Sequence, residues 1–320
     1  MSERKAKATR DGYGEGLLKL GEKNDRVIVM DADLAGATKT GVFKKAYPER
    51  FFDAGIAEGN MIGVAAGLLT TGYTVFASSF AMFAAGRAFE QIRNSIGYPH
   101  LNVKIAATHA GISVGEDGAS HQCCEDIALM RTIPGMTIIN PADWVEAEAA
   151  VLAAADYEGP VYLRFGRLAV PQIFDEETYK FEIGKGVELT DGNDVAIIAT
   201  GLMVNEALMA AETLKGEGIN ARVINIHTIK PLDEELVLKA ARECGCVVTA
   251  EEHNVIGGLG GAVCELLSEK LPTPAVRVGV NDTYGRSGPA KELLHLYGLD
   301  ADHIVAAAKE AIGLMGYATN

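Results

Sequence analysis

Cysteine and tryptophan are scarce in this chain, and their scarcity limits the classes of protein to which it can belong. The 320 residues include five cysteines and one tryptophan. A small and odd number of cysteines predicts no disulfide framework, and the Cys244-Gly-Cys246 pair is one residue too short for a CxxC redox or zinc motif. We therefore expect the cysteines to be small buried residues of a protein in a reducing compartment.

A surplus of basic residues and a long apolar segment are also missing. The formal net charge is -14, which argues against nucleic-acid binding because phosphate backbones require clustered lysine and arginine. No apolar run reaches the roughly eighteen residues of a membrane span, and the polar start of the chain does not resemble a signal peptide. These features predict a cytoplasmic protein without a membrane segment.

What the chain has instead is a regular alternation of apolar and amphipathic segments. Short apolar runs such as Val27–Met30 and Val103–Ala107 alternate with helical patterns such as Asn60–Thr71. Parallel strands joined by crossover helices produce this pattern. A second alternating unit follows a polar stretch at 171–185. The sequence therefore predicts an α/β protein of two domains, each a mostly parallel sheet flanked by helices, over residues 1–180 and 186–320.

The segment 108–122, which reads THAGISVGEDGASHQ, is unlike the rest of the chain. It holds two histidines, an acidic pair and five glycine or serine residues in fifteen positions, with little apolar surface to bury. Glycines permit sharp turns, and polar loops that follow buried strands carry the active sites of α/β proteins. The side chains predicted to face a small polar molecule are His109, Glu116, Asp117 and His121.

Two features that precede this loop have ordinary explanations when each is taken alone. Glu58 stands just before an apolar helical pattern, where a carboxylate favours the helix N-terminus. Phe80 and Phe83 follow an apolar run and fit a hydrophobic core. The order of the acid, the phenylalanine pair and the polar loop along the chain is what indicates a functional site.

These segments together resemble the transketolase family of thiamine-diphosphate enzymes, specifically their pyrimidine-binding and C-terminal domains. The matching stretches are GIAEGNMIGVAAGL (55–68), SSFAMF (78–83), THAGISVGEDGASHQ (108–122), NPAD (140–143), LRFGR (163–167), KPLDEELV (230–237) and VVTAEEHNVIGGLGGAV (247–263). The resemblance covers essentially the whole chain, and GEDGxxHQ is its most specific element.

The resemblance implies that the chain takes part in the transketolase reaction of the pentose phosphate pathway. In that reaction a two-carbon ketol unit passes from a ketose phosphate to an aldose phosphate, with thiamine diphosphate as the cofactor. Glu58 then pairs with N1′ of the aminopyrimidine ring, for which an apolar setting favours proton sharing. Phe80 and Phe83 form the wall against which this ring packs, and Asp33 matches a carboxylate near the cofactor. The usual third aromatic residue after Phe83 is replaced by Gly86-Arg87.

The resemblance also implies contacts to the sugar hydroxyls. His109 and His121 match family positions that hydrogen-bond the hydroxyls near the reacting carbons, and Asp117 matches a contact to the C2 hydroxyl. Three such residues in one glycine-rich loop favour a functional role over three unrelated loop side chains.

Phosphate binding favours arginine, because the guanidinium group makes two directed hydrogen bonds. Arg167 in LRFGR aligns with a phosphate ligand of the family, with Arg164 as the competing candidate, and Arg10 matches a second ligand. The family's phosphate-binding serine after the Asp33 position is missing, and Thr38 is the candidate to replace it.

The Gly-Asp-Gly run with its downstream Asn, through which the family binds the diphosphate and a divalent metal, is not found in the chain. We therefore assign no metal ligand here. The chain resembles the C-terminal part of a transketolase made as its own subunit. An N-terminal transketolase subunit is expected to supply the diphosphate and Mg²⁺ site, with the cofactor bridging the interface. Two copies of each subunit are expected, and an exposed Gly/Ala face on Asn60–Leu69 would predict poor behaviour without the partner.

Other functions remain open at this point. The β subunit of a 2-oxoacid dehydrogenase shares the domain order but normally lacks GEDGxxHQ, and another split thiamine-diphosphate synthase or a non-catalytic scaffold subunit would keep the same fold. The second half shows no convincing catalytic set. Glu251, Glu252 and His253 are consecutive on a strand end, so adjacent side chains point to opposite faces and cannot converge on one ion. Domain packing or a subunit interface is predicted for them.

Overall fold

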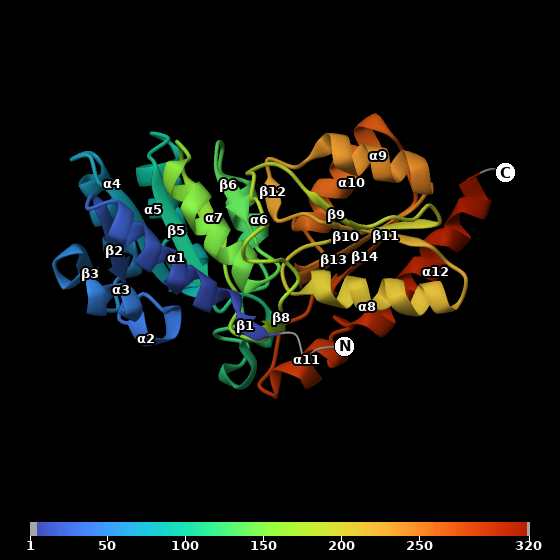
Figure 1. The fold of residues 1–320 in the computed structure, drawn as a ribbon, viewed down its shortest axis with the longest axis horizontal. Helices are drawn as coiled ribbons and strands as arrows, with labels where there is room; N and C mark the ends of the chain where they lie inside the picture. The colour runs from blue at the N-terminus through green and yellow to red at the C-terminus, as the bar shows by residue number, and fades with distance from the viewer. Residues whose placement is uncertain (1–4, 319–320) are drawn as a thin grey trace.

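The computed structural model describes residues 5–318, and its strands form three sheets (Figure 1). The first sheet has the order β12-β6-β7-β5-β4-β2-β3, the second has the order β14-β13-β10-β11-β9, and β1 pairs with β8 alone. The strands are β1 (Ala6–Ala8), β2 (Val27–Asp31), β3 (Phe51–Asp53), β4 (Thr74–Phe80), β5 (Val103–Thr108), β6 (Thr137–Ile139), β7 (Val161–Arg164), β8 (Ala169–Pro171), β9 (Val187–Thr190), β10 (Val195–Ala199), β11 (Ala221–Asn225), β12 (Thr228–Lys230), β13 (Val247–Asn254) and β14 (Ala275–Val280).

Helices connect the strands and cover the sheets. The α-helices are α1 (Thr9–Lys23), α2 (Ala35–Thr38), α3 (Gly41–Ala46), α4 (Glu58–Leu69), α5 (Phe89–Gln91), α6 (Asp126–Arg131), α7 (Trp144–Asp156), α8 (Met203–Gly216), α9 (Glu234–Cys244), α10 (Leu259–Lys270), α11 (Ala290–Leu296) and α12 (Ala301–Ala318). Short 3-10 segments are η1 (Pro48–Arg50) and η4 (Ile112–Asp117), and π-helical segments are η2 (Met82–Arg87) and η3 (Ile92–Gly97).

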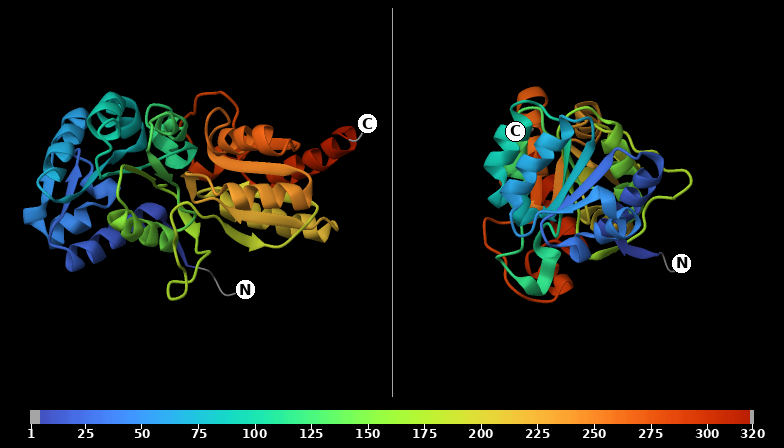
Figure 2. Two further views of the ribbon diagram at one scale, coloured as in Figure 1. Left: turned by 90° about the horizontal axis from the view of Figure 1, so that it is seen from above. Right: turned by 90° about the vertical axis from the view of Figure 1, so that its left-hand side faces the viewer.

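The predicted α/β architecture is confirmed. Neighbouring strands pair in parallel except for β12 with β6, β9 with β11, and β1 with β8. On one face of the first sheet, α1 and α7 pack through buried side chains such as Tyr13 and Leu17 of α1 and Val151 of α7. The other face is covered by α4 and η2. Figure 2 shows the two halves side by side along the long axis of the molecule.

One strand crosses between the halves. β12 comes from the second half of the chain but pairs antiparallel with β6, so that Thr228 lies opposite Ile139. Three residues carry too little periodicity to predict a strand, and nothing in the sequence indicates that this strand joins the first sheet. The first sheet is therefore complete only with a segment that follows the predicted linker.

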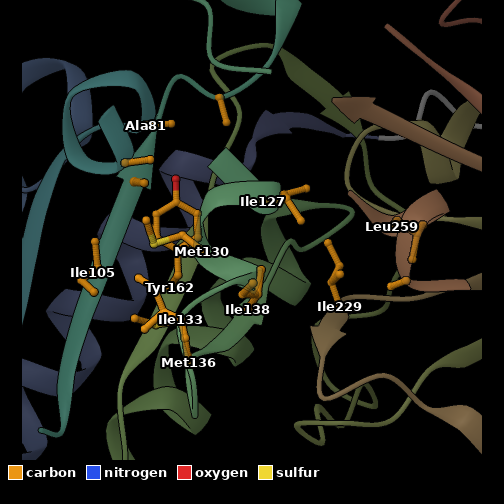
Figure 3. Packing of buried hydrophobic residues seen from close by; sticks show 14 of the residues in the cluster. Ala81, Ile105, Ile127, Met130, Ile133, Met136, Ile138, Tyr162, Ile229 and Leu259 are labelled. Atoms are coloured by element: carbon orange, nitrogen blue, oxygen red, sulfur yellow. The ribbon is translucent and has the colours of Figure 1, made fainter. Parts of the chain in front are cut away.

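The hydrophobic core is also continuous between the halves. Ile127 and Ile138 of the first half belong to the same buried cluster as Ile229 and Leu259 of the second half (Figure 3). The two halves therefore share buried apolar surface and are held together more firmly than two domains joined by a linker alone.

The segment 82–97 is helical but does not form one regular α-helix. The chain there forms η2, the short helix α5 and η3. π-helical turns are rare and often occur at functional sites. Here η2 carries both Phe83 and Arg87, which face the start of α4 as described below.

Four of the five cysteines are buried, and burial raises the pKa of each of these thiols, as expected for packing residues. They are Cys123, Cys124, Cys244 and Cys246. None of the helices within residues 5–318 combines the length and the apolar character needed to cross a membrane.

A buried carboxylate joins the two halves of the molecule. Glu146, near the start of α7, accepts hydrogen bonds from Asn225 Nδ2 (2.9 and 3.0 Å), the Ala142 N–H (2.7 Å) and the Tyr179 hydroxyl. Because Glu146 is fully buried, desolvation raises its pKa to about 7. The protonated form is therefore favoured by folding.

We predict that Glu146 makes the protein less stable as the pH rises from about 4.5 to about 7. The folded pKa of about 7 lies above the ordinary 4.5, so the stability contribution of the protonated group is complete below pH 4.5 and lost above pH 7, with a change on the order of 3 kcal/mol. Glu146→Gln should remove this part of the slope when unfolding free energies are measured by denaturant titration across this pH range. Identical slopes in both proteins would contradict the assignment.

Candidate active site

The predicted site residues gather at one edge of the first sheet. β2, β4 and β5 are parallel, so their carboxyl ends open on the same side, and they end at Asp31, Phe80 and Thr108. This edge is where open α/β sheets bind ligands. The segments that directly follow the three strands carry Asp33, Phe83 and His109.

Glu58 is the first residue of α4 and is only 4% exposed. Its Oε1 lies 3.3 Å from Nη1 of Arg87, which also places its guanidinium 4.6 Å from the centre of the Phe83 ring. Arg87, which the resemblance expects in place of a third aromatic residue, therefore pairs with the predicted catalytic acid. The sequence placed Arg87 beside Phe83 but gave no signal for this pairing.

Aromatic side chains from three segments meet beside this acid. The Phe80 and Phe83 rings are stacked with their centres 5.9 Å apart, and His109 stacks on Phe80 at 3.8 Å. His121 meets Phe83 edge-on at 5.4 Å. The structure thus brings together four of the residues that the sequence singled out, which come from β4, η2 and the polar loop.

His109 is held as a neutral imidazole. Burial, assisted by the nearby charges of Arg10 and Arg167, lowers its pKa to about 3. Arg10 Nη1 lies 3.0 Å from Nε2, and since a guanidinium only donates, Nε2 accepts and Nδ1 carries the proton toward the Thr108 hydroxyl at 2.9 Å. His109 is therefore suited to hydrogen bonding at neutral pH rather than to proton donation from a charged ring.

Arginine side chains make the neighbourhood of His109 positive. Arg10 Nη1 also donates to the Ala37 carbonyl at 2.9 Å, while its buried Nε has no hydrogen-bond partner within residues 5–318. Arg167 Nη1 donates to the Val114 carbonyl and lies 3.1 Å from the Glu116 carboxylate. A guanidinium with an unsatisfied donor suits an anionic group.

Two candidates for phosphate binding are excluded by their contacts. Arg164 is 3% exposed and is paired with the buried Asp126, with Nε 2.8 Å from Oδ2, so it has a structural role. Thr38 is fully buried and donates its hydroxyl to Asp31 Oδ2 at 2.6 Å, so it cannot replace the missing serine.

Asp33 and Asp117 are both exposed, and within residues 5–318 neither makes a hydrogen bond or ion pair with the aromatic cluster. Asp33 adopts a left-handed conformation (φ 62°) just after β2, and its N–H donates to Asp53 Oδ1 at 3.0 Å. Asp117 ends the η4 segment of the polar loop.

The residues beside Glu58 fit the pyrimidine ring of thiamine diphosphate. Val75 and Ala77 pack with α4 residues, while Phe76 packs with Tyr13 of α1, so Ser79 faces the α4 side of the sheet. Within the described residues, the buried Ser79 Oγ and Gln91 Oε1 have no hydrogen-bond partner. Unsatisfied buried oxygens next to an acid and an aromatic pair are typical of a site that a polar ring completes.

The second half of the molecule supports the polar loop. Glu252 Oε1 accepts the Ser113 N–H at 2.6 Å, and its carboxylate lies so close to Gly111 that a Cβ there would clash. Gln122 Nε2 donates to the Arg286 carbonyl at 2.9 Å. Domain packing is one of the two roles that the sequence predicts for Glu252, but nothing in the sequence indicates its partner Ser113, which lies 139 residues away.

Glu251 turns away from Glu252, as alternation along the strand predicts. Its two carboxylate oxygens accept the N–H groups of Leu259 (2.7 Å) and Gly260 (2.8 Å) at the start of α10. The start of α10 is therefore capped by the chain's own carboxylate.

Comparison with known protein families matches most of the sequence to one family. Residues 5–172 match the family "Transketolase, pyrimidine binding domain", and residues 184–304 match "Transketolase, C-terminal domain". The chain belongs to the transketolase family. Its pyrimidine-binding domain implies dependence on thiamine diphosphate.

Several relatives match this transketolase chain along most of the chain's own length. A protein of Methanocaldococcus jannaschii called "Putative transketolase C-terminal section" is 56% identical over 306 residues, with 95% of this chain and 96% of the relative covered. A 6-deoxy-6-sulfo-D-fructose transketolase subunit of Clostridium sp. is 46% identical, with 94% and 93% covered. Human transketolase is 39% identical over 95% of this chain, which spans about half (49%) of that longer protein.

A solved structure has the same fold. It is described as "Split gene transketolase, inactive beta4 tetramer", superimposes with a TM-score of 0.90 at 56% identity, and covers 96% of this chain and 99% of its own. The resemblance to a C-terminal transketolase subunit is thereby confirmed.

We predict that Glu252 keeps the polar loop of this transketolase chain in place. Glu252→Ala should speed hydrogen exchange at the Ser113 amide by about tenfold to a hundredfold, since a hydrogen bond to a charged group contributes about 1.5–3 kcal/mol. Glu252→Gln retains an acceptor and should stay close to the parent protein. Glu235→Ala, which removes an exposed carboxylate, is the matched control. Equal exchange in the alanine variant and the parent would refute this role.

Proposed function

We propose that this chain is the catalytic C-terminal subunit of a two-subunit transketolase. It transfers a two-carbon ketol unit from a ketose phosphate to an aldose phosphate with thiamine diphosphate shared with an N-terminal subunit. That partner supplies the diphosphate and Mg²⁺ ligands. Residues 1–180 form the pyrimidine-binding domain and 186–320 the C-terminal domain.

One observation carries this proposal: Glu58, the Phe80–Phe83 pair and His109 with Arg10 converge at the carboxyl edge of one sheet. A scaffold subunit has no need for a buried acid beside unsatisfied polar atoms. The arrangement combines a place for a heteroaromatic ring with a positive place for an anionic sugar.

When bound, thiamine diphosphate supplies the electron sink that stabilises a two-carbon carbanion. Glu58 would hold the proton shared with N1′ of the pyrimidine through a carboxylate whose Oε1 also pairs with Arg87. Phe80 and Phe83 pack against the ring. Neutral His109 hydrogen-bonds the sugar hydroxyls together with His121, and Asp117 and Asp33 contact the C2 hydroxyl and the cofactor region, respectively.

Arg10 and Arg167 bind the terminal anion of the sugar. Arg10 offers its unpaired Nε, while Arg167 exchanges the exposed carboxylate of Glu116 for the substrate anion. This exchange requires little free energy, because Glu116 is solvent-exposed and surface ion pairs contribute little to stability.

The surface around Glu58 supports contact with a partner subunit. Ile56 is 75% exposed, and Phe52 and Val64 of the neighbouring β3 and α4 are also exposed. Gly63 and Gly67 on α4 have open space where a side chain would stand. A similar chain described as an inactive beta4 tetramer supports the expectation that this chain needs its partner and associates with itself.

We expect ketol transfer to require both subunits and Glu58. The N-terminal partner and this chain would be mixed with thiamine diphosphate, Mg²⁺, xylulose 5-phosphate and ribose 5-phosphate, and glyceraldehyde 3-phosphate would be followed. Glu58→Gln should lower kcat at least about a hundredfold, the usual size of an acid–base contribution. Glu49→Gln, an exposed carboxylate of the same domain, should leave the rate unchanged.

The outcomes separate the alternatives. Activity that survives Glu58→Gln would contradict the role of Glu58. Cofactor binding to the assembled subunits without ketol transfer would favour a synthase or a 2-oxoacid dehydrogenase β subunit. No cofactor binding in any mixture would favour a scaffold.

A donor with a terminal sulfonate is a second candidate, because a 46% identical relative is named for 6-deoxy-6-sulfo-D-fructose. Thr38 is committed to Asp31, so the anion must rely on arginine, which suits either group. Arg167→Ala should raise KM about tenfold or more for an anionic donor and little for an uncharged ketose, because charged hydrogen bonds contribute about 1.5–3 kcal/mol. Steady-state kinetics with both donors checks this, with the exposed Arg93→Ala as control. An equal rise for both would argue against anion binding by Arg167.

A further inference from the structure

Two histidines and an aspartate converge on the second half of the molecule, outside the site described above. His295, in the last turn of α11, and His303, in the first turn of α12, each place Nδ1 2.6 Å from a different oxygen of Asp300. One ligand atom from each of the three residues lies within 4.8 Å of the other two. The same nitrogen of each imidazole is turned toward one carboxylate.

The turn between α11 and α12 creates this arrangement. Gly298 has a left-handed conformation (φ 72°), which glycine adopts without strain, and a Cβ at this position would approach the His303 ring at 3.2 Å. Asp300 also accepts the His303 N–H at 3.0 Å and so caps α12. The turn and the cap together fix both rings relative to the carboxylate.

The local charge is suited to a cation in spite of the positive end of the α12 dipole. Glu206 of α8 accepts the Ala301 N–H at 3.1 Å, so a second carboxylate stands at the helix start. Lys291 of α11 is a cationic neighbour of Glu206.

We propose that His295, Asp300 and His303 form a binding site for a divalent transition-metal ion of the Zn²⁺ type. Two imidazole nitrogens and one carboxylate oxygen form a ligand set that favours zinc over Mg²⁺ or Ca²⁺, which prefer oxygen ligands. The exposure of both histidines leaves a fourth position for water. The metal takes the Nδ1 atoms, and each ring then carries its proton on Nε2.

Metal binding at this site would fasten α11 to α12. The segment that leads into α11 lies against the polar loop, because a Cβ at Gly115 would stand 3.3 Å from the Gly288 carbonyl and 3.6 Å from the Ala290 nitrogen. The ion would therefore stabilise the segment that packs against the polar loop, and it would not contact the substrate. This proposal is independent of the transketolase activity.

Titration of the chain alone with Zn²⁺, followed by calorimetry, tests the site. The parent protein should bind Zn²⁺ at this site, and His295→Ala or His303→Ala should each weaken that binding at least about tenfold. Asp300→Asn retains an oxygen that can cap α12 and should weaken it as well. Co²⁺ in place of Zn²⁺ should give visible absorption bands that depend on both histidines.

His100→Asn is the matched control, because it removes another exposed histidine and asparagine tolerates the left-handed conformation at this position (φ 55°). It should leave Zn²⁺ affinity unchanged, and Mg²⁺ should not compete. The proposal is overturned if the His295→Ala/His303→Ala protein, shown by circular dichroism to be folded, binds Zn²⁺ with the stoichiometry of the parent. Absence of Zn²⁺ binding in the parent would also overturn it and leave Asp300 as a helix cap with two hydrogen-bonded rings.

Discussion

The ion pair between Arg164 and Asp126 is the contact on which the arrangement of the site depends. Both residues are buried, and removing one partner of such a pair leaves a charge that the interior cannot solvate. Arg164 Nη2 also donates to the carbonyls of Cys123 (3.3 Å) and Glu252 (2.9 Å). One guanidinium thus fixes the end of β7, the exit of the polar loop and the strand of the second half that supports this loop.

A strongly acidic protein here builds a locally positive site. The net charge of -14 would repel sugar phosphates, yet Arg10 and Arg167 are close enough to His109 to lower its pKa. Neighbouring acids reduce the electrostatic repulsion between these cations, as Glu116 does where it pairs with Arg167 at the surface. Global charge therefore indicates little about the sign of a small-molecule site, while it remains informative about nucleic-acid binding.

The sequence allowed the fold class and most elements to be predicted, because buried parallel strands and amphipathic helices have distinct periodicities. It also indicated the polar loop from its glycines and titratable groups, although the expectation that this segment lies outside the core is wrong for Ile112 and Val114, which are fully buried. Long-range pairings could not be predicted: the partners of Glu58 and Ser113 are side chains that no spacing rule connects to them. The π-helical turns of η2 were missed for a similar reason, since their sequence has helical character and tertiary contacts decide the number of residues per turn.

The strand β12 has a consequence for how such a polypeptide can be divided. A cut at the linker near residues 181–185 would leave β6 as an unprotected sheet edge in one product, and the other product would carry β12 without a sheet to join. Exposed edges of this kind template aggregation. A division of the chain that keeps β6 and β12 on one polypeptide would leave this sheet edge paired.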